Sequence, residues 1–254
     1  MRLDVYLVQS GLSETRERAQ ELIRNGSVLC NGRPCKKNST LISDTDKITL
    51  ISSLKYVGRG GYKLEKALQV FSISLEGKTV LDVGASTGGF TDCSLQNGAK
   101  EVFAVDVGHD QLAPSLREDP RVHNLQGVHV KDLANHYSGT PDFICVDISF
   151  LSLEKVLPHL VAFSTNADLV VLVKPQFEVR HKKSVIRDPK VHREVLRSVV
   201  RCAEALGYTV CGLDFSPVKG TEGNIEYLLH LSLSGVSSEV DISSVIHAAQ
   251  ISLK

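Results

Sequence analysis

The chain has 254 residues, of which 42% are hydrophobic and 23% are charged, and its formal net charge is zero. This length is enough for one sizeable α/β core and a small second domain. No apolar run approaches the roughly 18 residues of a membrane-spanning helix, and Arg2 and Asp4 interrupt the start, where a secretory signal would lie. The six cysteines include no C-x-x-C pair that would hold zinc, so we expect no metal site and a reduced, cytoplasmic protein.

Charge is distributed unevenly along the chain. Residues 1–60 hold ten Lys and Arg against six Asp and Glu, whereas the remainder holds 19 against 23. The front segment is therefore positive and the rest is negative. This excess points to a polyanionic partner, although an ordinary solvated surface accounts for the same counts.

The first fifty residues have the pattern of a small α+β module. Apolar spacing and turn residues predict, in order, a helix over 3–9, a helix opened by Ser13 and stopped by Gly26, a strand over 28–30, a turn at Asn31–Gly32 and a strand over 46–51. Basic residues gather around the second helix and the hairpin. These are Arg16, Arg18, Arg24, Arg33, Lys36 and Lys37.

This module resembles the alpha-L RNA-binding domain of small-subunit ribosomal protein four and of pseudouridine synthases. The residues that carry the resemblance are Arg2-Leu-Asp4, Leu7, Gly11-Leu12, Arg16, Ala19, Leu22-Ile23, Gly26, Val28, Asn31-Gly32 and Asp46-Lys-Ile48. The resemblance implies that basic side chains contact RNA phosphates, which would position the RNA without reading its sequence. The candidate RNA-binding residues are Arg16, Arg18, Arg24, Lys36, Lys37 and Arg59.

Residues 52–62 are rich in glycine and basic residues and are expected to be an interdomain linker. The expected domains are therefore an RNA-binding domain over 1–51 and a catalytic domain over 63–254.

Beyond the linker, apolar strand patterns alternate with helical patterns, which is typical of a doubly wound parallel α/β sheet. Strands are expected near 79–83, 102–106, 121–125, 142–147 and 168–174, helices near 63–71, 89–97, 110–117, 151–163 and 190–206, a closing hairpin near 208–215 and 224–232, and a last helix near 240–252.

A glycine-rich turn follows the first of these strands. Asp82 and Gly84 lie at the end of the strand, and Gly88 and Gly89 precede a helix, whose N-terminus suits a ligand. The spacing G-x-x-x-G-G differs from the G-x-G-x-x-G of dinucleotide sites, so it favours a compact nucleoside such as S-adenosylmethionine. Asp106 ends the next strand, where a carboxylate can bind ribose hydroxyls. An ordinary tight strand-to-helix turn is the alternative.

Two further strands end in charged residues. Asp147 follows one apolar run and Lys174 follows the next. A lysine at the mouth of a buried strand is partly desolvated, which would lower its pKa and make it a candidate base. A surface lysine and a helix-capping aspartate are the alternatives. The segment after Asp147 lacks the proline-rich turn of amino-group methyltransferases, which favours a hydroxyl as the methyl acceptor.

The segment from Tyr56 to Leu231 resembles TlyA-type proteins, which join the alpha-L domain to an FtsJ-like ribose methyltransferase. The motifs are Tyr-Val-Gly-Arg-Gly-Gly-Tyr-Lys63, Asp82-Val-Gly-Ala-Ser-Thr-Gly-Gly-Phe-Thr-Asp92, Val-Asp147-Ile-Ser-Phe, Leu-Val-Lys174-Pro-Gln-Phe-Glu178, Arg187-Asp-Pro189 and Gly-Asn-Ile-Glu226-Tyr. The resemblance implies a Rossmann-like seven-stranded class I sheet and 2′-O-methylation of a ribose in ribosomal RNA or assembled ribosomal subunits.

The resemblance also implies which residues form the site. The catalytic tetrad of ribose methyltransferases falls on Lys63, Asp147, Lys174 and Glu226. The S-adenosylmethionine site falls on Asp82, Gly84, Ala85, Ser86, Thr87, Gly88, Gly89, Phe90 and Asp106. The implied roles are that Lys174 deprotonates or orients the 2′-hydroxyl, Asp147 tunes Lys174, and Lys63 and Glu226 hold the hydroxyl.

Two other functions are compatible with the same residues. One is a ribosome assembly factor without turnover, and the other is a membrane-active haemolysin, as the family is often labelled. The chain has no long basic amphipathic helix of the kind that binds membranes, which argues against the haemolysin. The basic stretch Arg180 to Lys183 is expected to contact phosphates or to be a solvated approach to the next helix.

Overall fold

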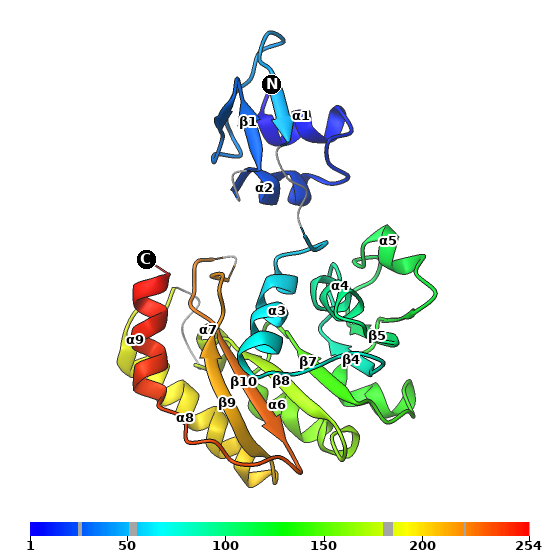
Figure 1. Cartoon of the computed structure of the whole chain (residues 1–254), viewed down its shortest axis with the longest axis vertical. Helices are drawn as coiled ribbons and strands as arrows, with labels where there is room; N and C mark the ends of the chain where they lie inside the picture. The colour runs from blue at the N-terminus through cyan, green and yellow to red at the C-terminus, as the bar shows by residue number, and fades with distance from the viewer. Residues whose placement is uncertain (25–26, 51–54, 180–184, 221, 254) are drawn as a thin grey trace. The chain divides into compact units, whose positions relative to one another are not determined.

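The computed structural model of the chain describes residues 1–24, 27–50, 55–179, 185–220 and 222–253. The chain forms two compact units, residues 1–59 and 60–254 (Figure 1). Gly26, residues 52–54 of the expected linker and the basic stretch 180–183 lie outside the described residues. Residues 60–62, which we expected in the linker, instead form the first turn of a helix of the second unit.

The first unit packs two helices against a small antiparallel sheet with the strand order β2-β1-β3. Its elements are α1 (Leu3–Gln9), α2 (Arg16–Arg24), β1 (Val28–Cys30), β2 (Arg33–Pro34) and β3 (Ile48–Leu50). Its buried core consists of Leu3, Leu7, Ala19, Leu22, Ile23, Val28 and Ile42. The second helix begins later than predicted because Thr15, and not Ser13, accepts the backbone N–H of Arg18 at 3.2 Å and so caps the helix.

A buried carboxylate ties the start of the first unit together. Asp4 has no exposed surface, and its oxygens accept hydrogen bonds from Arg2, Arg16 and Gln20, each at 2.9 Å. The Arg2 guanidinium, against the cost of burial, holds the pKa of Asp4 far below its usual range. Arg16 therefore supports the fold of this unit in addition to any role toward RNA.

The second unit is built on a seven-stranded sheet with the order β6-β5-β4-β7-β8-β10-β9. The first five strands in this order are parallel, and β10 runs antiparallel to both β8 and β9. The strands are β4 (Thr79–Val83), β5 (Glu101–Asp106), β6 (Val122–Gln126), β7 (Phe143–Val146), β8 (Asp168–Val173), β9 (Thr209–Phe215) and β10 (Tyr227–Ser232). This arrangement confirms the expected methyltransferase fold class, in which β7 and β8 are continuous apolar runs because helices cover both faces.

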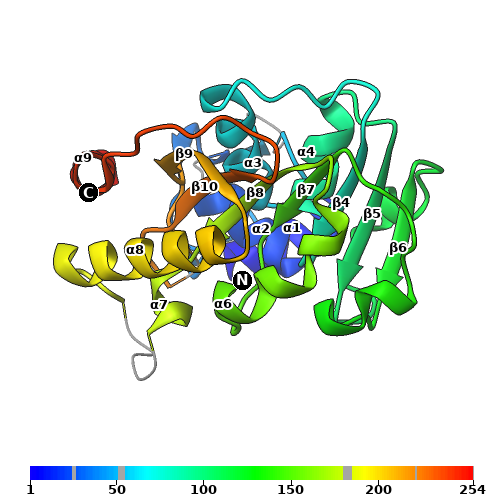
Figure 2. The ribbon, with the colours of Figure 1, turned by 90° about the horizontal axis from the view of Figure 1, so that it is seen from below.

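Helices lie on both faces of this sheet (Figure 2). Helices α3 and α4 pack together on one face, and α6 and α8 lie on the other, while α9 contacts α8 and β9. The helices are α3 (Gly60–Val70), α4 (Gly89–Gln96), α5 (Pro114–Arg117), α6 (Leu153–Val156), α7 (Pro175–Glu178), α8 (Pro189–Ala205) and α9 (Ile242–Ser252).

Two expected helices are shorter than predicted, and proline accounts for both. The helix expected over 110–117 begins only at Pro114, because proline favours the first helical turn and restrains the residue before it from helical geometry. The helix expected over 151–163 ends at Val156 and continues as 3-10 turns over 157–159 and 161–163. Pro158 lacks the N–H that an α-helix would need there.

Candidate active site

The glycine turn after β4 has a backbone that only glycine tolerates. Gly84 has φ +92°, and a Cβ at this position would lie 2.7 Å from the carbonyl oxygen of Asp147. Gly88 has φ +93°, is the N-cap of α4 and packs against the side chains of Leu112 and Leu116. Both glycines are therefore required by the conformation of the turn. The turn lines a cavity of about 460 Å³ with Gly84, Ala85, Ser86, Thr87, Gly89 and Phe90.

Asp106 links this turn to the next strand. One oxygen of its carboxylate accepts the backbone N–H of Ser86 at 2.8 Å, and the other accepts that of Gly108 at 2.7 Å. Asp106 also lines a second cavity of about 480 Å³. Its apolar walls include Val105, Val107, Val128, Val130 and Ile148.

These apolar walls were not predicted. A cavity with apolar walls suits a flat, largely apolar ring. Val107 comes directly after Asp106, and Val128 and Val130 follow β6. The rule that ligands bind beyond the carboxyl ends of parallel strands would have identified both segments, had it been applied to β6 as well as to its neighbours.

Asp82 lies beneath the turn and lines neither cavity. It is fully buried, and one oxygen accepts the Thr91 hydroxyl at 2.6 Å while the other has no hydrogen-bond partner among the described residues. Burial raises the pKa of Asp82 to about 7, and the charge of Asp147 adds to this effect. Asp82 is therefore placed to support the turn through α4, and its assignment as a cofactor-binding residue stays a prediction.

Replacing Asp82 by asparagine is expected to change how stability depends on pH. The folded pKa of about 7 lies above the usual value of 3.8, so the wild-type protein loses stability as pH rises from about 4 to 7. The loss is at most about 4 kcal/mol, since one pKa unit corresponds to ~1.4 kcal/mol. Urea unfolding of both proteins at pH 5 and pH 8 checks this. The prediction fails if the free energy of unfolding of Asp82→Asn, relative to that of wild type, is no higher at pH 8 than at pH 5.

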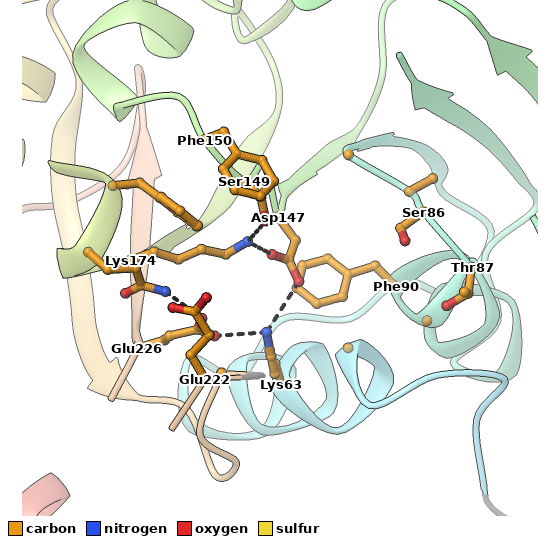
Figure 3. Close-up of a pocket in the computed structure, with 17 residues that line it drawn as sticks. Lys63, Ser86, Thr87, Phe90, Asp147, Ser149, Phe150, Lys174, Glu222 and Glu226 are labelled. Carbon is orange, nitrogen blue, oxygen red and sulfur yellow. Dashed lines mark hydrogen bonds and ion pairs between the residues drawn. The ribbon is translucent and has the colours of Figure 1, made fainter. Parts of the chain in front are cut away.

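The structure brings the four predicted catalytic residues together at one end of the sheet (Figure 3). Lys63 comes from α3, Asp147 follows β7, Lys174 follows β8, and Glu226 precedes β10. The Nζ of Lys63 donates to Glu226 at 2.8 Å and lies 3.4 Å from Asp147. The Nζ of Lys174 forms an ion pair with the other oxygen of Asp147 at 2.5 Å and donates to the Ser149 hydroxyl at 3.0 Å.

The tetrad places two amino groups beside two carboxyl groups in a buried site. Lys63, Lys174 and Glu226 are all buried. Burial opposes the charged form of Lys63, but Asp147 and Glu226 outweigh it and raise the pKa of Lys63. Burial likewise opposes the ionised form of Asp147, yet the two lysines lower its pKa. Asp147 is therefore held as a carboxylate between two amino groups and is not the cap of α6.

Seven residues of the first cavity were not predicted as site residues. They are Gly60, Ser149, Phe150, Gln176, Phe177, Gly220 and Glu222. Gln176 donates to Glu226 at 3.4 Å, and the rings of Phe150 and Phe177 lie 5.0 Å apart. Phe150 has φ +69° and is 86% exposed, which is unusual for a large apolar residue. Both cavities share Gly84, Ser86, Asp147, Ser149 and Phe150, so they adjoin at Asp147.

The candidate RNA-binding residues lie in the first unit. Arg24, Lys36 and Lys37 are exposed on its surface. Arg18 donates to the backbone oxygen of Tyr56 at 2.7 Å, and Arg16 binds Asp4 at 2.9 Å. Arg59 is the last residue of the unit. Arg16 and Arg18 thus have structural roles within the unit, which the sequence could not distinguish from a role toward RNA.

Comparison with protein families identifies the chain. A family model described as FtsJ-like methyltransferase matches residues 56–233, and a model of the S4 domain matches residues 1–48. The chain belongs to the FtsJ-like methyltransferase family. These two matches confirm the expected resemblance, including the N-terminal S4 domain. Membership in this family implies the use of S-adenosylmethionine.

Relatives in this family match nearly the whole chain. The 16S/23S rRNA (cytidine-2'-O)-methyltransferase TlyA of Mycobacterium tuberculosis is 44% identical over 91% of this chain and 89% of its own. Hemolysin A of Brachyspira hyodysenteriae is 42% identical over 91% of this chain and 99% of its own. A solved Streptococcus thermophilus structure, with hemolysin in its description, has a TM-score of 0.78 and 41% identity and covers 99% of this chain and 96% of its own.

Two kinds of feature are missing from the residues that the structure describes. None of their helices is long and apolar enough to cross a membrane. No group of three or more His, Cys, Asp or Glu among them is placed to hold a metal ion.

Proposed function

We propose that this protein transfers a methyl group from S-adenosylmethionine to a ribose 2′-hydroxyl of ribosomal RNA. The observation that carries the proposal is the buried tetrad Lys63–Asp147–Lys174–Glu226 at the junction of two cavities. One cavity has the apolar walls and terminal carboxylate that suit a nucleoside, and the other exposes two amino groups to a hydroxyl. The names of the relatives support ribosomal RNA as the substrate.

The residues of the cavities fit S-adenosylmethionine. At Gly84 any Cβ would meet the backbone of Asp147, so glycine lets the turn lie directly against the segment that carries Asp147. Asp106 would bind the ribose hydroxyls, and Val107, Val130 and Ile148 would enclose the adenine. When bound, S-adenosylmethionine supplies the methyl group from a sulfonium centre.

In this proposal the tetrad positions the acceptor and manages its proton. Lys174 orients the 2′-hydroxyl and, in its uncharged amine form, takes the proton as the new O–C bond forms and the S–C bond breaks. Asp147 fixes the Nζ of Lys174 through their ion pair, and Lys63 and Glu226, which bind each other at 2.8 Å, hold the hydroxyl oxygen in place. Alignment of the oxygen with the methyl group would supply most of the rate.

The exposed lysines of the S4 domain provide a test of RNA binding. Lys36→Ala combined with Lys37→Ala is expected to weaken binding of ribosomal RNA and to reduce the slope of log affinity against log salt by about 1 for each phosphate that is no longer neutralised. Arg16 is unsuited to this test because its removal also unpairs the buried Asp4. Lys155→Ala, in an exposed position of α6, is the control. An unchanged salt slope in the double variant would contradict the assignment.

We expect Phe150 to stack on a nucleobase. Its ring is exposed, lines the first cavity and lies 5.0 Å from the ring of Phe177. Phe150→Ala is expected to lower kcat/KM for RNA by about 5-fold to 150-fold, because stacking on an aromatic ring is worth ~1–3 kcal/mol per base. Phe150→Tyr retains the ring and is expected to retain activity. Val236→Ala alters another highly exposed apolar residue and serves as the control. Equal activity of Phe150→Ala and wild type would exclude stacking.

The direct test of the function is methyl transfer itself. The protein is incubated with methyl-labelled S-adenosylmethionine and undermethylated ribosomal subunits, and the labelled nucleotide is mapped. Label on the 2′-oxygen of a defined ribose supports the proposal. Binding of cofactor and subunits without any label would favour the assembly factor, and lysis of liposomes by the protein would favour the haemolysin. Action on ribosomal RNA would place the protein in the cytoplasm.

A further inference from the structure

Two loops carry most of the side chains that face the first cavity. Residues 147–152 connect β7 to α6 and include Asp147, Ser149 and Phe150. Lys174 follows β8 and leads directly into α7, which includes Phe177. The chemistry requires both loops to hold one geometry, because an acceptor must meet groups from each of them.

Contacts join the two loops near the cavity. Lys174 binds both Asp147 and Ser149, and the rings of Phe150 and Phe177 lie 5.0 Å apart. These contacts fix the first part of the loop over 147–152. They leave open what fixes its far end, where α6 begins.

Glu178 holds that far end. It is the last residue of α7, and its Oε1 accepts the backbone N–H of Leu153, the first residue of α6, at 2.9 Å. Ser152 occupies the N-cap position but makes no side-chain capping hydrogen bond within the described part of the chain. Because the first N–H groups of a helix have no partner within it, Glu178 supplies the cap from a distant part of the chain.

The surroundings of Glu178 do not favour its charge. It lines a cavity of about 320 Å³ with Glu154 of α6 and with Glu194, Arg201 and Cys202 of α8. Burial, with a smaller effect from Glu154, raises the pKa of Glu178 to about 7, against the effect of the Leu153 N–H. Favourable solvation of a charged side chain therefore does not explain why this residue is a glutamate. The hydrogen bond that it accepts from Leu153 does explain it.

We propose that Glu178 is a positioning residue that fixes the loop over 147–152 to the lysine-bearing turn, so that Asp147, Ser149 and Phe150 face the acceptor together. Glu178 lies outside the lining of both catalytic cavities, so it acts through these three residues and not by contact with substrate. The effect on methyl transfer rests on the proposed function, but the hold on the loop does not.

A fluorescent reporter can test the hold on the loop without activity. The chain contains no tryptophan, so Phe150→Trp introduces a single indole into the loop. In this background, Glu178→Ala is expected to lower the steady-state anisotropy of the indole, whereas Glu178→Gln, which keeps the acceptor oxygen, is expected to leave it unchanged. Glu194→Ala removes another glutamate from the same cavity and is the matched control. Unchanged anisotropy in Glu178→Ala would overturn the proposal.

Kinetics then test the consequence in the otherwise wild-type chain. Glu178→Ala is expected to lower kcat about 10-fold to 100-fold, as small misplacements of reacting groups do, with KM for S-adenosylmethionine little changed. Glu178→Gln is expected to restore the rate at pH 6, where the wild-type glutamate is also mostly uncharged. Thermal unfolding of each variant separates this effect from misfolding. Full activity of Glu178→Ala, or failure of Glu178→Gln to restore it, would overturn the proposal. A changed anisotropy with no methyl transfer by any form would refute only the proposed function.

Discussion

Lys174→Ala is expected to abolish methyl transfer while cofactor binding survives. The Nζ of Lys174 lies between Asp147 and Ser149 and faces the cavity, so the variant loses the group that orients the hydroxyl and takes its proton. The rate is expected to fall by about 10²-fold to 10⁴-fold, the usual effect of removing a general acid or base. Single-turnover transfer to ribosomal subunits measures the rate, and calorimetric titration with S-adenosylmethionine measures binding.

Lys174→Arg separates the two roles of the lysine. Arginine carries a positive charge beside Asp147 at any ordinary pH, so it can orient the hydroxyl but cannot accept its proton. A rate close to that of Lys174→Ala would indicate that proton transfer is the main role, and a much smaller loss would indicate orientation. Lys155→Ala is again the control, because Lys155 is exposed and lines neither cavity. Retained turnover in Lys174→Ala would refute the assignment of the tetrad.

The sequence predicted the parts of the site that follow from regular structure. Asp106, Asp147 and Lys174 were found because parallel strands end at the same edge of a sheet, and the strands themselves are marked by apolar runs. The glycine turn was found because Gly84 and Gly88 have a backbone that other residues avoid. Lys63 and Glu226 follow no strand end of this kind, and only the family resemblance indicated them.

The parts that were missed depend on contacts between distant segments. Nothing local to Phe150 predicts φ +69° or an exposed ring, because both arise from how the loop is fixed between β7 and α6. Glu178 is 25 positions from the N–H that it caps, so no sequence spacing shows the pair. Helix ends were misjudged where apolar periodicity was weighed above proline, as at Pro114 and Pro158.

Lys63→Met is expected to destabilise the methyltransferase domain strongly. Glu226 is only 3% exposed, and Lys63 is its partner at 2.8 Å, so the variant leaves a buried carboxylate without its ion pair. Breaking a buried pair in this way costs about 3–5 kcal/mol. Urea unfolding, followed by circular dichroism, measures the loss. Lys100→Met removes a lysine from an exposed pair with Glu101 and is expected to cost about 1 kcal/mol or less.

A double variant shows whether the cost comes from the unpaired charge. In Lys63→Met combined with Glu226→Gln neither buried charge of the pair remains, so stability is expected to recover part of the loss caused by Lys63→Met. Recovery would be incomplete because Asp147 also loses the Lys63 amino group at 3.4 Å. Both variants are expected to lose methyl transfer, since the acceptor would lack one of the two groups proposed to hold it in Lys63→Met and both in the double variant. Additive losses of stability in the double variant would show that Lys63 and Glu226 are not coupled.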